Sequence, residues 1–325
     1  MTNLQQTATQ LLAEFNPKIN EVMAPHTYFK VGGPAEVYLE LENHQQLVKT
    51  ALLCQQHQLS FRILGGGSNV IVSDTGVKGI IIHYTNQAIE DLNQASGTSD
   101  QPPTYLVKAA SGIKMATLVS QSVQLGYTGL EYFLGVPGTL GGSIFNNSHY
   151  LSDLIGSYVH RVQILSKDGH ELWLTQAECE FGYDHSRFHT THELILAVEF
   201  ALAKGDSASS QKKIIEATQY RAQTQPLGPP SSGCIFQNVP NDDRLRVLFP
   251  QFATKSHVPG GYIIDQAGLK GTRMGGVSVS TKHAAWFINE GGATAQDVVL
   301  LINQVKRTVR DRFDIQLHEE VFYLE

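Results

Sequence analysis

Residues 129–147 carry residue types that bring main chain close to a ligand. They read GLEYFLGVPGTLGGSIFNN and contain five glycines: Gly129, Gly135, Gly138, Gly141 and Gly142. Helices and strands lose stability at this density of glycine, so the segment is expected to serve another purpose. Pro137 fixes one bend, and backbone N–H groups can then point at an anion. The stretch suits the first turn of a helix aimed at phosphate; a tight glycine turn inside a core is the alternative.

A second glycine cluster lies at residues 61–72, which read FRILGGGSNVIV. The pattern predicts an apolar strand, a GGGSN turn and another apolar strand, with bare amides and two small polar side chains at the strand end. No Gly-Lys-Ser/Thr follows, which excludes a P-loop, and the spacing differs from the dinucleotide-binding G-x-G-x-x-G. Two separate glycine-rich anion sites favour a ligand with an extended diphosphate, such as a flavin dinucleotide.

Histidine and cysteine spacing favours no metal site. Residues 185–192 hold three histidines spaced H-x3-H-x2-H in a turn-like segment without cysteine, so surface histidines are the favoured interpretation. The three cysteines, Cys54, Cys179 and Cys234, are far apart and form no C-x-x-C. That usage argues against a disulfide framework and favours a reducing, cytoplasmic compartment.

The chain as a whole has the composition of a globular protein. Its 325 residues are 42% hydrophobic and 17% charged, enough for two or three domains. The net charge of −6 and the lack of a basic run argue against nucleic-acid binding. No apolar stretch approaches the roughly 18 residues of a membrane span, and the N-terminus lacks the pattern of a secretory signal.

Periodicity predicts the elements that must position these segments. Residues 35–64 read as strand, helix and strand, and residues 295–313 as a long amphipathic helix. The polar run 204–211 (KGDSASSQ) is the expected domain boundary. Residues 93–104 hold few apolar side chains and are expected to form a mobile surface loop. The alternation of helices and strands predicts an α+β fold.

Four segments resemble one known family. Residues 26–34 (HTYFKVGGP), 64–70 (LGGGSNV) and 135–147 are similar to the flavin-binding half of the UDP-N-acetylenolpyruvoylglucosamine reductases, in the vanillyl-alcohol-oxidase (PCMH-type) superfamily. Residues 260–282 (GGYIIDQAGLKGTRMGGVSVSTK) resemble the C-terminal signature of that family. The resemblance runs from residue 26 to the end of the chain.

The resemblance implies two domains and a reaction. The domains are a two-lobed FAD-binding PCMH-type domain at 1–204, split near 70–80, and a smaller C-terminal α+β substrate-binding domain at 205–325. The reaction is the NADPH-dependent reduction of UDP-N-acetylglucosamine enolpyruvate to UDP-N-acetylmuramate, a step of peptidoglycan precursor synthesis. FAD would be bound and NADPH a co-substrate, in a cytoplasmic monomer whose other partner is the UDP-sugar enolpyruvyl ether.

The resemblance also assigns binding positions. Those for FAD are Tyr28, Gly65, Gly66, Gly67, Ser68, Asn69, Gly112, Gly135, Pro137, Gly138, Thr139, Gly141, Gly142 and Ile144. Those for the substrate are Tyr183, Arg221, Gln225, Gln237, Asn238 and Gln266.

The resemblance also implies two catalytic positions. Residues 220–238 (YRAQTQPLGPPSSGCIFQN) resemble a family segment in which a serine gives a proton to the substrate, and Cys234 holds that position. A thiol, with a usual pKa of about 8.5, is mostly protonated at neutral pH yet more acidic than serine, so it can act as the acid. The terminal LHEEVF resembles L-E-P-E-V-R and places Glu320 as the glutamate that polarises the enolate. Gln237 replaces the family's lysine and Phe322 its last arginine.

The third catalytic position departs from the family. Residues 181–188 read FGYDHSRF where the family has Tyr-Arg-x-Ser, so Asp184 replaces the arginine that holds the substrate carboxylate. An aspartate repels a carboxylate unless it is protonated or turned away. Arg187 is therefore predicted to turn inward as the cation, with Asp184 outward or bonded to a backbone amide. The alternative interpretation of Arg187 is a solvated surface charge, in which case Arg221 is the next candidate.

Two other functions stay open at this level. One is an FAD-dependent oxidase of the same superfamily, which would share the glycine-rich segments but not the signature at 260–282. The other is a non-catalytic relative that binds flavin or a UDP-sugar, suggested by Asp184, Gln237 and Phe322.

Overall fold

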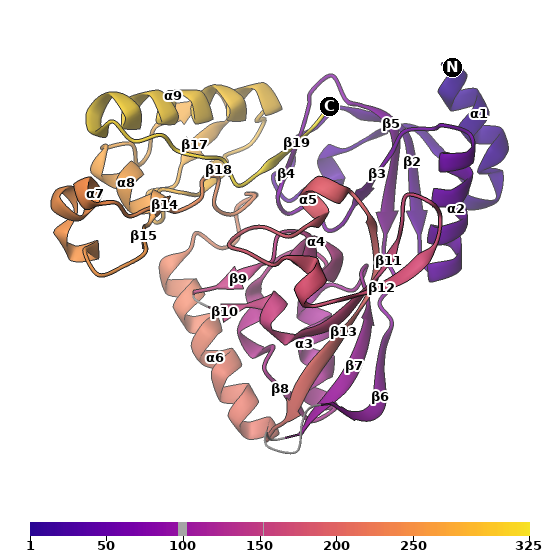
Figure 1. Ribbon diagram of the computed structural model, residues 1–325. Coiled ribbons are helices and arrows are strands. Elements are labelled where there is room, and N and C mark those ends of the chain that lie inside the picture. The colour runs from indigo at the N-terminus through magenta and orange to yellow at the C-terminus, as the bar shows by residue number, and fades with distance from the viewer. Residues whose placement is uncertain (97–102, 152) are drawn as a thin grey trace. The chain divides into compact units, whose positions relative to one another are not determined.

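The computed structural model describes residues 1–96, 103–151 and 153–325 (Figure 1). The chain divides into two compact units, each built from separate segments. Unit 1 comprises Met1–Asn20, Glu36–Gly66 and Gly79–Arg221; unit 2 comprises Glu21–Ala35, Gly67–Lys78 and Ala222–Glu325. No helix of the described chain has the length and apolar character needed to cross a membrane.

Unit 1 holds two larger sheets, the two-stranded sheet β10-β9 and several helices. Its elements are α1 (Asn3–Leu11), β1 (Lys18–Val22), β2 (Pro34–Leu41), α2 (His44–Gln56), β3 (Phe61–Leu64), β5 (Val77–Tyr84), β6 (Ile89–Ser96), β7 (Thr104–Ala110), α3 (Met115–Gln124), β8 (Tyr127–Thr128), α4 (Leu140–Phe145), β9 (His149–Tyr150), β10 (Asp153–Leu154), β11 (Val159–Leu165), β12 (Glu171–Thr175), α5 (Phe188–Thr191), β13 (Leu194–Lys204) and α6 (Ser207–Thr224).

The smaller sheet of unit 1 has the order β1-β2-β5-β3. Helix α2 begins where the side chain of Asn43 accepts the amide of Gln46, and it buries Leu47 and Ala51 in a core shared with α1 and the strands. The expected strand–helix–strand unit is present, but β5 lies between its two strands and pairs in parallel with β3. The GGGSN segment therefore leaves the sheet at the end of an edge strand.

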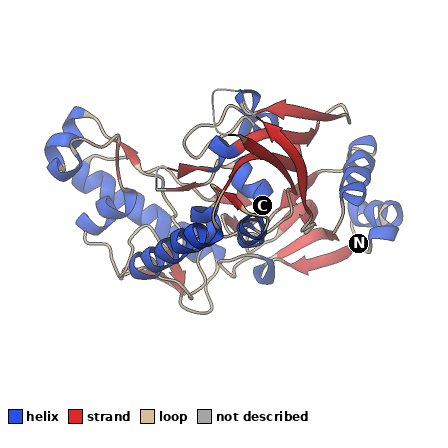
Figure 2. Cartoon of the chain, turned by 90° about the horizontal axis from the view of Figure 1, so that it is seen from below, coloured by secondary structure: helices blue, strands red, loops and turns tan. Residues whose placement is uncertain are grey.

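The larger sheet of unit 1 has the order β12-β11-β13-β7-β6, with β8 paired to β13, and its strands are curved (Figure 2). Helix α3 packs Leu118 and Val119 into the core that this sheet lines. The expected surface loop at 93–104 is wrong at its two ends, because residues 93–96 and 104 belong to β6 and β7. Polar side chains are compatible with β6 since it is an edge strand. Residues 97–102 lie outside the described chain.

The boundary between the units also differs from the expectation at residue 204. Residues 207–211 of the polar run form the start of α6, because the Asp206 carboxylate accepts the amide of Ser209 at the beginning of the helix. Within the helix, Ser210 donates to the buried carboxylate of Glu131 at 2.6 Å. Contact with a buried acid thus keeps a polar sequence helical, and the division between units falls between Arg221 and Ala222.

Unit 2 is built around a long C-terminal helix. Its elements are β4 (Val70–Val72), β14 (Val239–Pro240), α7 (Asp243–Leu248), β15 (His257–Val258), α8 (Gly260–Gln266), β16 (Arg273–Met274), β17 (Val277–Val279), β18 (Phe287–Asn289), α9 (Ala295–Phe313) and β19 (Phe322–Leu324). Helix α9 has the predicted bounds: Thr294 and Asp297 form a capping box, and Asp314 ends the helix with φ 54°.

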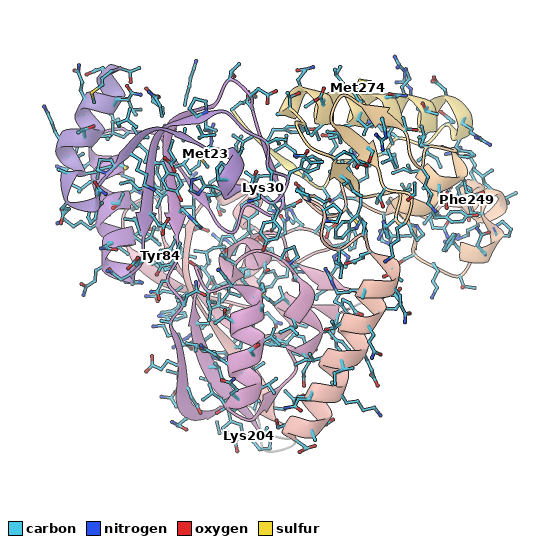
Figure 3. The ribbon with its side chains drawn as sticks, turned by 180° about the vertical axis from the view of Figure 1, so that it is seen from behind. Met23, Lys30, Tyr84, Lys204, Phe249 and Met274 are labelled. Atoms are coloured by element: carbon cyan, nitrogen blue, oxygen red, sulfur yellow. The ribbon has the colours of Figure 1, made fainter. Side chains whose placement is uncertain are left out.

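The core of unit 2 joins residues far apart in the sequence. Val298, Leu301 and Val305 of α9 pack with side chains of α8 and of the sheet β16-β17-β18. Phe249, labelled in Figure 3, lies edge-on to Tyr262 at a ring distance of 5.5 Å. β19 pairs in parallel with β4, so the end of the chain lies beside the segment that follows GGGSN.

Candidate active site

The two glycine-rich loops contact each other within unit 1. A Cβ added to Gly66 would lie 2.6 Å from the Cα atom of Gly138, and one added to Gly65 would lie 2.5 Å from Oγ1 of Thr139. Gly138 has φ +99°, a conformation that favours glycine. The two glycine-rich motifs therefore form one site, in which the backbone of one motif contacts the backbone of the other, rather than two separate anion sites.

The amides of this site fall into two groups. Those of Leu140 and Gly141 donate to the carbonyl oxygens of Ile113 and Ser111 at 2.8 and 2.7 Å, so they hold α4 in place instead of facing a ligand. Among the described residues, no protein acceptor pairs with the amides of Gly66 or Gly138. The latter are the N–H groups that fit an anion.

Three other glycines assigned to FAD have different surroundings. Gly142, in the first turn of α4, has open space: an added Cβ would meet only Oγ1 of Thr139, at 3.9 Å. Gly112 packs against the backbone of Tyr84 and Asn86, and Gly135 lies under the side chain of Arg221. Gly142 is thus the position where a ligand can approach, while the other two glycines have a packing role. The Ile144 side chain is fully buried.

The rest of the GGGSN segment belongs to unit 2. Gly67 has φ +65°, and a Cβ there would overlap the carbonyl oxygen of His26. Its own carbonyl accepts the amide of Tyr28 at 2.9 Å, and the Tyr28 side chain is exposed. Asn69 donates from Nδ2 to the carbonyl oxygen of Glu320 at 3.0 Å, and its carbonyl accepts the amide of Phe322. A residue assigned to the cofactor thereby anchors the C-terminal segment.

The backbone segments that carry the two predicted acids of the reaction are hydrogen-bonded to each other in unit 2. The amide of Glu320 donates to the carbonyl oxygen of Ile235 at 2.8 Å, and Ile235 directly follows Cys234. On the opposite edge, Cys234 forms a β-bridge with Trp286, and the amide of Ile235 donates to Ala285. Cys234 is half-buried, whereas burial raises the pKa of Cys54 to about 11 and that of Cys179 to about 12. Cys234 is the accessible thiol of the chain.

Asp184 does not occupy the expected position. Instead of turning outward or to a backbone amide, it is buried and its Oδ1 lies 3.1 Å from Nδ1 of His149. Arg187 is paired with the Glu193 carboxylate through Nε and Nη2, both at 3.1 Å, and Nη1 donates to the Glu178 carbonyl oxygen. The pairing with a carboxylate offsets the charge that Arg187 was expected to offer a substrate.

Known proteins resemble this chain over nearly its whole length. A family model described as FAD binding domain matches residues 35–175, and one described as UDP-N-acetylenolpyruvoylglucosamine reductase, C-terminal domain, matches residues 225–324. The reductase of Anoxybacillus flavithermus is 35% identical over 305 residues, covering 94% of this chain and 93% of the relative. UDP-N-acetylenolpyruvoylglucosamine reductase 1 of Bacillus cereus is 33% identical over 307 residues, with 93% of each chain covered. The chain belongs to the UDP-N-acetylenolpyruvoylglucosamine reductase family.

A solved structure supports the same family. The UDP-N-acetylenolpyruvylglucosamine reductase of Thermus caldophilus superposes with a TM-score of 0.74 and 25% identity, covering 95% of this chain and 98% of that one. The family resemblance and the α+β architecture expected from the motifs are thereby confirmed. The oxidase alternative loses support, because the C-terminal reductase domain is matched as well as the flavin domain.

Unit 2 contains buried polar atoms that the family motifs did not single out. Oγ of Ser232, Nδ1 of His283 and Nε1 of Trp286 have no hydrogen-bond partner within the described chain. Ser232 lies two residues before Cys234, Trp286 is the bridge partner of Cys234, and the His283 ring is 6.5 Å from the Trp286 ring. Buried polar groups left unpaired are costly, so such a group beside the thiol indicates ligand contacts. Only the folded chain brings these residues together.

The predicted substrate residues are distributed over both units. In unit 2, Oε1 of Gln225 is buried without a partner in the described chain, and Oδ1 of Asn238 accepts the amide of Gly260. The backbone amide of Gln237 donates to the carbonyl oxygen of His318. Gln266 is exposed at the end of α8. In unit 1, Tyr183 is exposed beside His149, and Arg221 covers Gly135.

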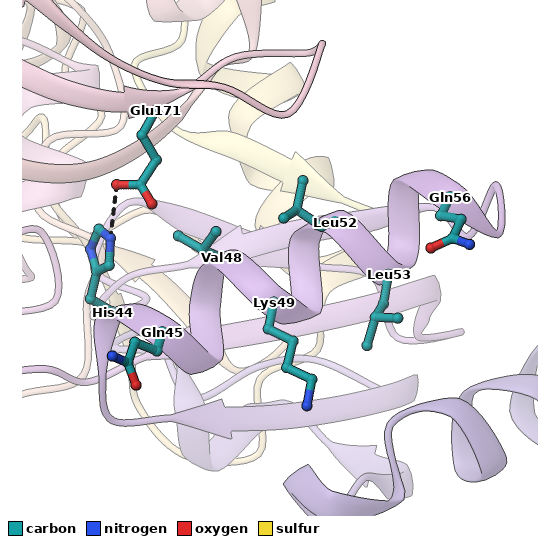
Figure 4. Close-up of a pocket in the computed structure, with 8 residues that line it drawn as sticks. All are labelled: His44, Gln45, Val48, Lys49, Leu52, Leu53, Gln56 and Glu171. Carbon is teal, nitrogen blue, oxygen red and sulfur yellow. Dashed lines mark hydrogen bonds and ion pairs between the residues drawn. The ribbon is translucent and has the colours of Figure 1, made fainter.

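Two other features of unit 1 are a histidine pair and a surface depression. His185 and His189 contact each other through their rings, 4.9 Å apart, and no group of three metal-type ligands occurs in the described residues. Helix α2 and Glu171 line a depression of about 360 Å³, with His44 bonded to Glu171 at 2.9 Å (Figure 4). The depression contains none of the residues that the family motifs assign to FAD or substrate.

Proposed function

We propose that this chain catalyses the NADPH-dependent reduction of UDP-N-acetylglucosamine enolpyruvate to UDP-N-acetylmuramate, with bound FAD. The observation that carries the proposal is the hydrogen bond between Glu320 and Ile235, which places the predicted acids Cys234 and Glu320 on adjacent backbone segments. The full-length similarity to reductases of Bacillus cereus and Anoxybacillus flavithermus supports the substrate and the reductant.

The glycine site of unit 1 fits the diphosphate of FAD. Gly66 leaves no room for a side chain, Gly138 has φ +99°, and the N–H groups of both have no protein acceptor among the described residues. Gly142 adds open space at the start of α4. When bound, FAD supplies the hydride-transfer chemistry that links NADPH to the double bond of the substrate.

The protein's own residues have to supply the proton. Negative charge develops on the carbon beside the substrate carboxylate, and an acid must protonate that carbon. Cys234 is the proposed proton donor, and the half-buried site beside Trp286 limits access of water to the thiol. Glu320, fixed by Asn69 and Ile235 through its backbone, is the proposed polarising acid. The thiolate regains a proton from solvent after each turnover.

The test is a titration of purified holoprotein with the enolpyruvyl substrate in the presence of NADPH, followed by flavin absorbance. We expect NADPH oxidation that depends on the substrate, with one UDP-N-acetylmuramate formed per NADPH. Rapid reaction of the reduced flavin with oxygen and none with substrate would identify an oxidase. A shift of the flavin spectrum on titration without turnover would identify a non-catalytic binding protein.

The proposal includes a cytoplasmic monomer. The absence of cysteine pairs and the soluble composition support that location. Light scattering after size-exclusion chromatography tests the monomer, and a mass of twice 35.7 kDa would contradict it. Fractionation of expressing cells tests the location.

A further inference from the structure

Asp184, which stands where the family has an arginine, is buried and forms an ion pair with His149. The side chain of Asp184 is 5% exposed and that of its partner His149 is 24% exposed. Oδ2 of Asp184 is also buried and has no hydrogen-bond partner among the described residues. A buried carboxylate with so few donors is stabilised when the neighbouring imidazole carries a proton.

The surrounding backbone holds this pair in place. Asp184 has φ +48° in a turn closed by hydrogen bonds between Gly182 and His185. Nδ2 of Asn147 donates to the carbonyl oxygen of Gly182 at 2.7 Å, and Oγ of Ser186 donates to that of Phe145 at 2.5 Å. The turn is therefore attached on both sides of Asp184 to the segment that leads from α4 to His149.

We propose that His149, held as an imidazolium by Asp184, replaces the family arginine and binds the carboxylate of the enolpyruvyl substrate. The inference rests on the proposed function. His149 retains accessible surface, and its ring lies 5.2 Å from that of Tyr183, a predicted substrate residue that is 38% exposed. A cation there would stabilise the charge that develops beside the carboxylate. Asp184 is a positioning residue, because its carboxylate points at the imidazole.

The first candidate cation, Arg187, does not offer an equal alternative. Arg187 is bonded to Glu193 through two nitrogens. Titratable groups near His149 in the described chain include Asp184 and Tyr183 in the turn and, on the paired strand β10, Asp153, whose carboxylate accepts the Tyr158 hydroxyl. The positive charge of Arg221 acts on Tyr150, the next residue after His149. His185 and His189 lie close to Asp184 in sequence, and the negative charge of Asp184 acts on His189.

The experiment compares variants of the holoenzyme. His149→Gln removes the charge, His149→Lys retains one, and Asp184→Asn leaves the imidazole without its anion. His170→Gln, at an exposed histidine of the same unit, is the matched control. Each protein is measured for substrate affinity by calorimetry, for reoxidation of reduced flavin by substrate, and for flavin reduction by NADPH, across the pH range in which histidine titrates.

We expect His149→Gln to weaken substrate binding about 10-fold and slow reoxidation about 100-fold, with flavin reduction by NADPH unchanged. His149→Lys should recover most of this loss. In the wild type, reoxidation should slow as the pH rises and the imidazole loses its proton. Asp184→Asn should move this decline to lower pH, because the anion that favours the imidazolium is gone.

Normal reoxidation by His149→Gln would overturn the inference, as would equal loss of both half-reactions, which indicates a structural role. Selective slowing by Arg187→Ala with no effect of His149→Gln would assign the cation to Arg187. If the wild type does not reduce the enolpyruvyl substrate at all, the proposed function fails, and this result is separate from that of the variants.

Discussion

The backbone amide of Glu320 donates a hydrogen bond of 2.8 Å to the carbonyl oxygen of Ile235, the neighbour of Cys234. Asn69 holds the carbonyl oxygen of the same glutamate through its side chain. Glu320 is thus fixed by backbone contacts to two distant segments of unit 2. The predicted proton donor and the predicted polarising acid are placed by β-type pairing, independently of their own side chains.

Cys234→Ala should slow reoxidation of the reduced flavin by substrate about 100-fold, because the protonating group is lost. Flavin reduction by NADPH should stay nearly intact, as stopped-flow absorbance can show. Cys234→Ser should retain much of the activity, since serine stands at this position in the family. Cys54→Ala, at a buried thiol, serves as the control. Rapid reoxidation by the Cys234→Ala protein would remove Cys234 from the mechanism.

The adjacent glutamates Glu320 and Glu319 give a matched pair of variants. Glu319 is bonded to Lys306 at 2.8 Å and to the Tyr323 hydroxyl at 2.5 Å, which indicates a structural role. Glu320→Gln should slow reoxidation by substrate at least 10-fold, whereas Glu319→Gln should lower the melting temperature and leave that rate unchanged. The opposite pattern would transfer the catalytic role to Glu319.

The glycine site predicts different effects at two positions. Gly66→Val should abolish flavin binding, because its side chain would overlap the backbone of Gly138. Gly142→Val, where the chain has open space, should leave the apoprotein folded by circular dichroism but weaken FAD binding. Full flavin occupancy in the folded Gly142→Val protein would show that FAD does not approach this turn.

Glu131 predicts a loss of stability in acid. Burial would raise its pKa, but hydrogen bonds from Ser210, Thr128 and the amide of Gly129 lower the pKa to about 2. Because the folded pKa lies below the unfolded one, the stabilisation is complete above about pH 5 and is lost as the pH falls toward 2. Glu131→Gln should lower the free energy of unfolding by about 2–3 kcal/mol at neutral pH.

Denaturant unfolding at several pH values measures the Glu131 effect. The difference between wild type and Glu131→Gln should shrink as the pH falls, since the wild-type carboxylate then becomes neutral as well. Glu216→Gln, at an exposed position of α6, is the control and should change the stability little. A difference that stays constant with pH would show that the charge of Glu131 does not contribute.

Local patterns in the sequence were sufficient for several elements. Helix α9 has its predicted bounds because the capping residue Thr294 and the apolar periodicity act within a few residues. The glycine runs predicted a close approach between backbone segments, because glycine is the one residue without a side chain to fill the space between them. Local patterns failed at α6, where residues 207–211 of the polar run are helical through Asp206 and the distant Glu131.

The sequence by itself determined the family, the reductase motifs and the candidate residues Cys234 and Glu320, because each rests on residue type and short spacing. Tertiary structure decided which residues meet. The Asn69–Glu320 contact joins residues 251 positions apart, and the His149–Asp184 pair joins residues 35 apart. Such pairs form only when packing and strand pairing offset the entropy of closing the intervening chain, and no local pattern records that balance.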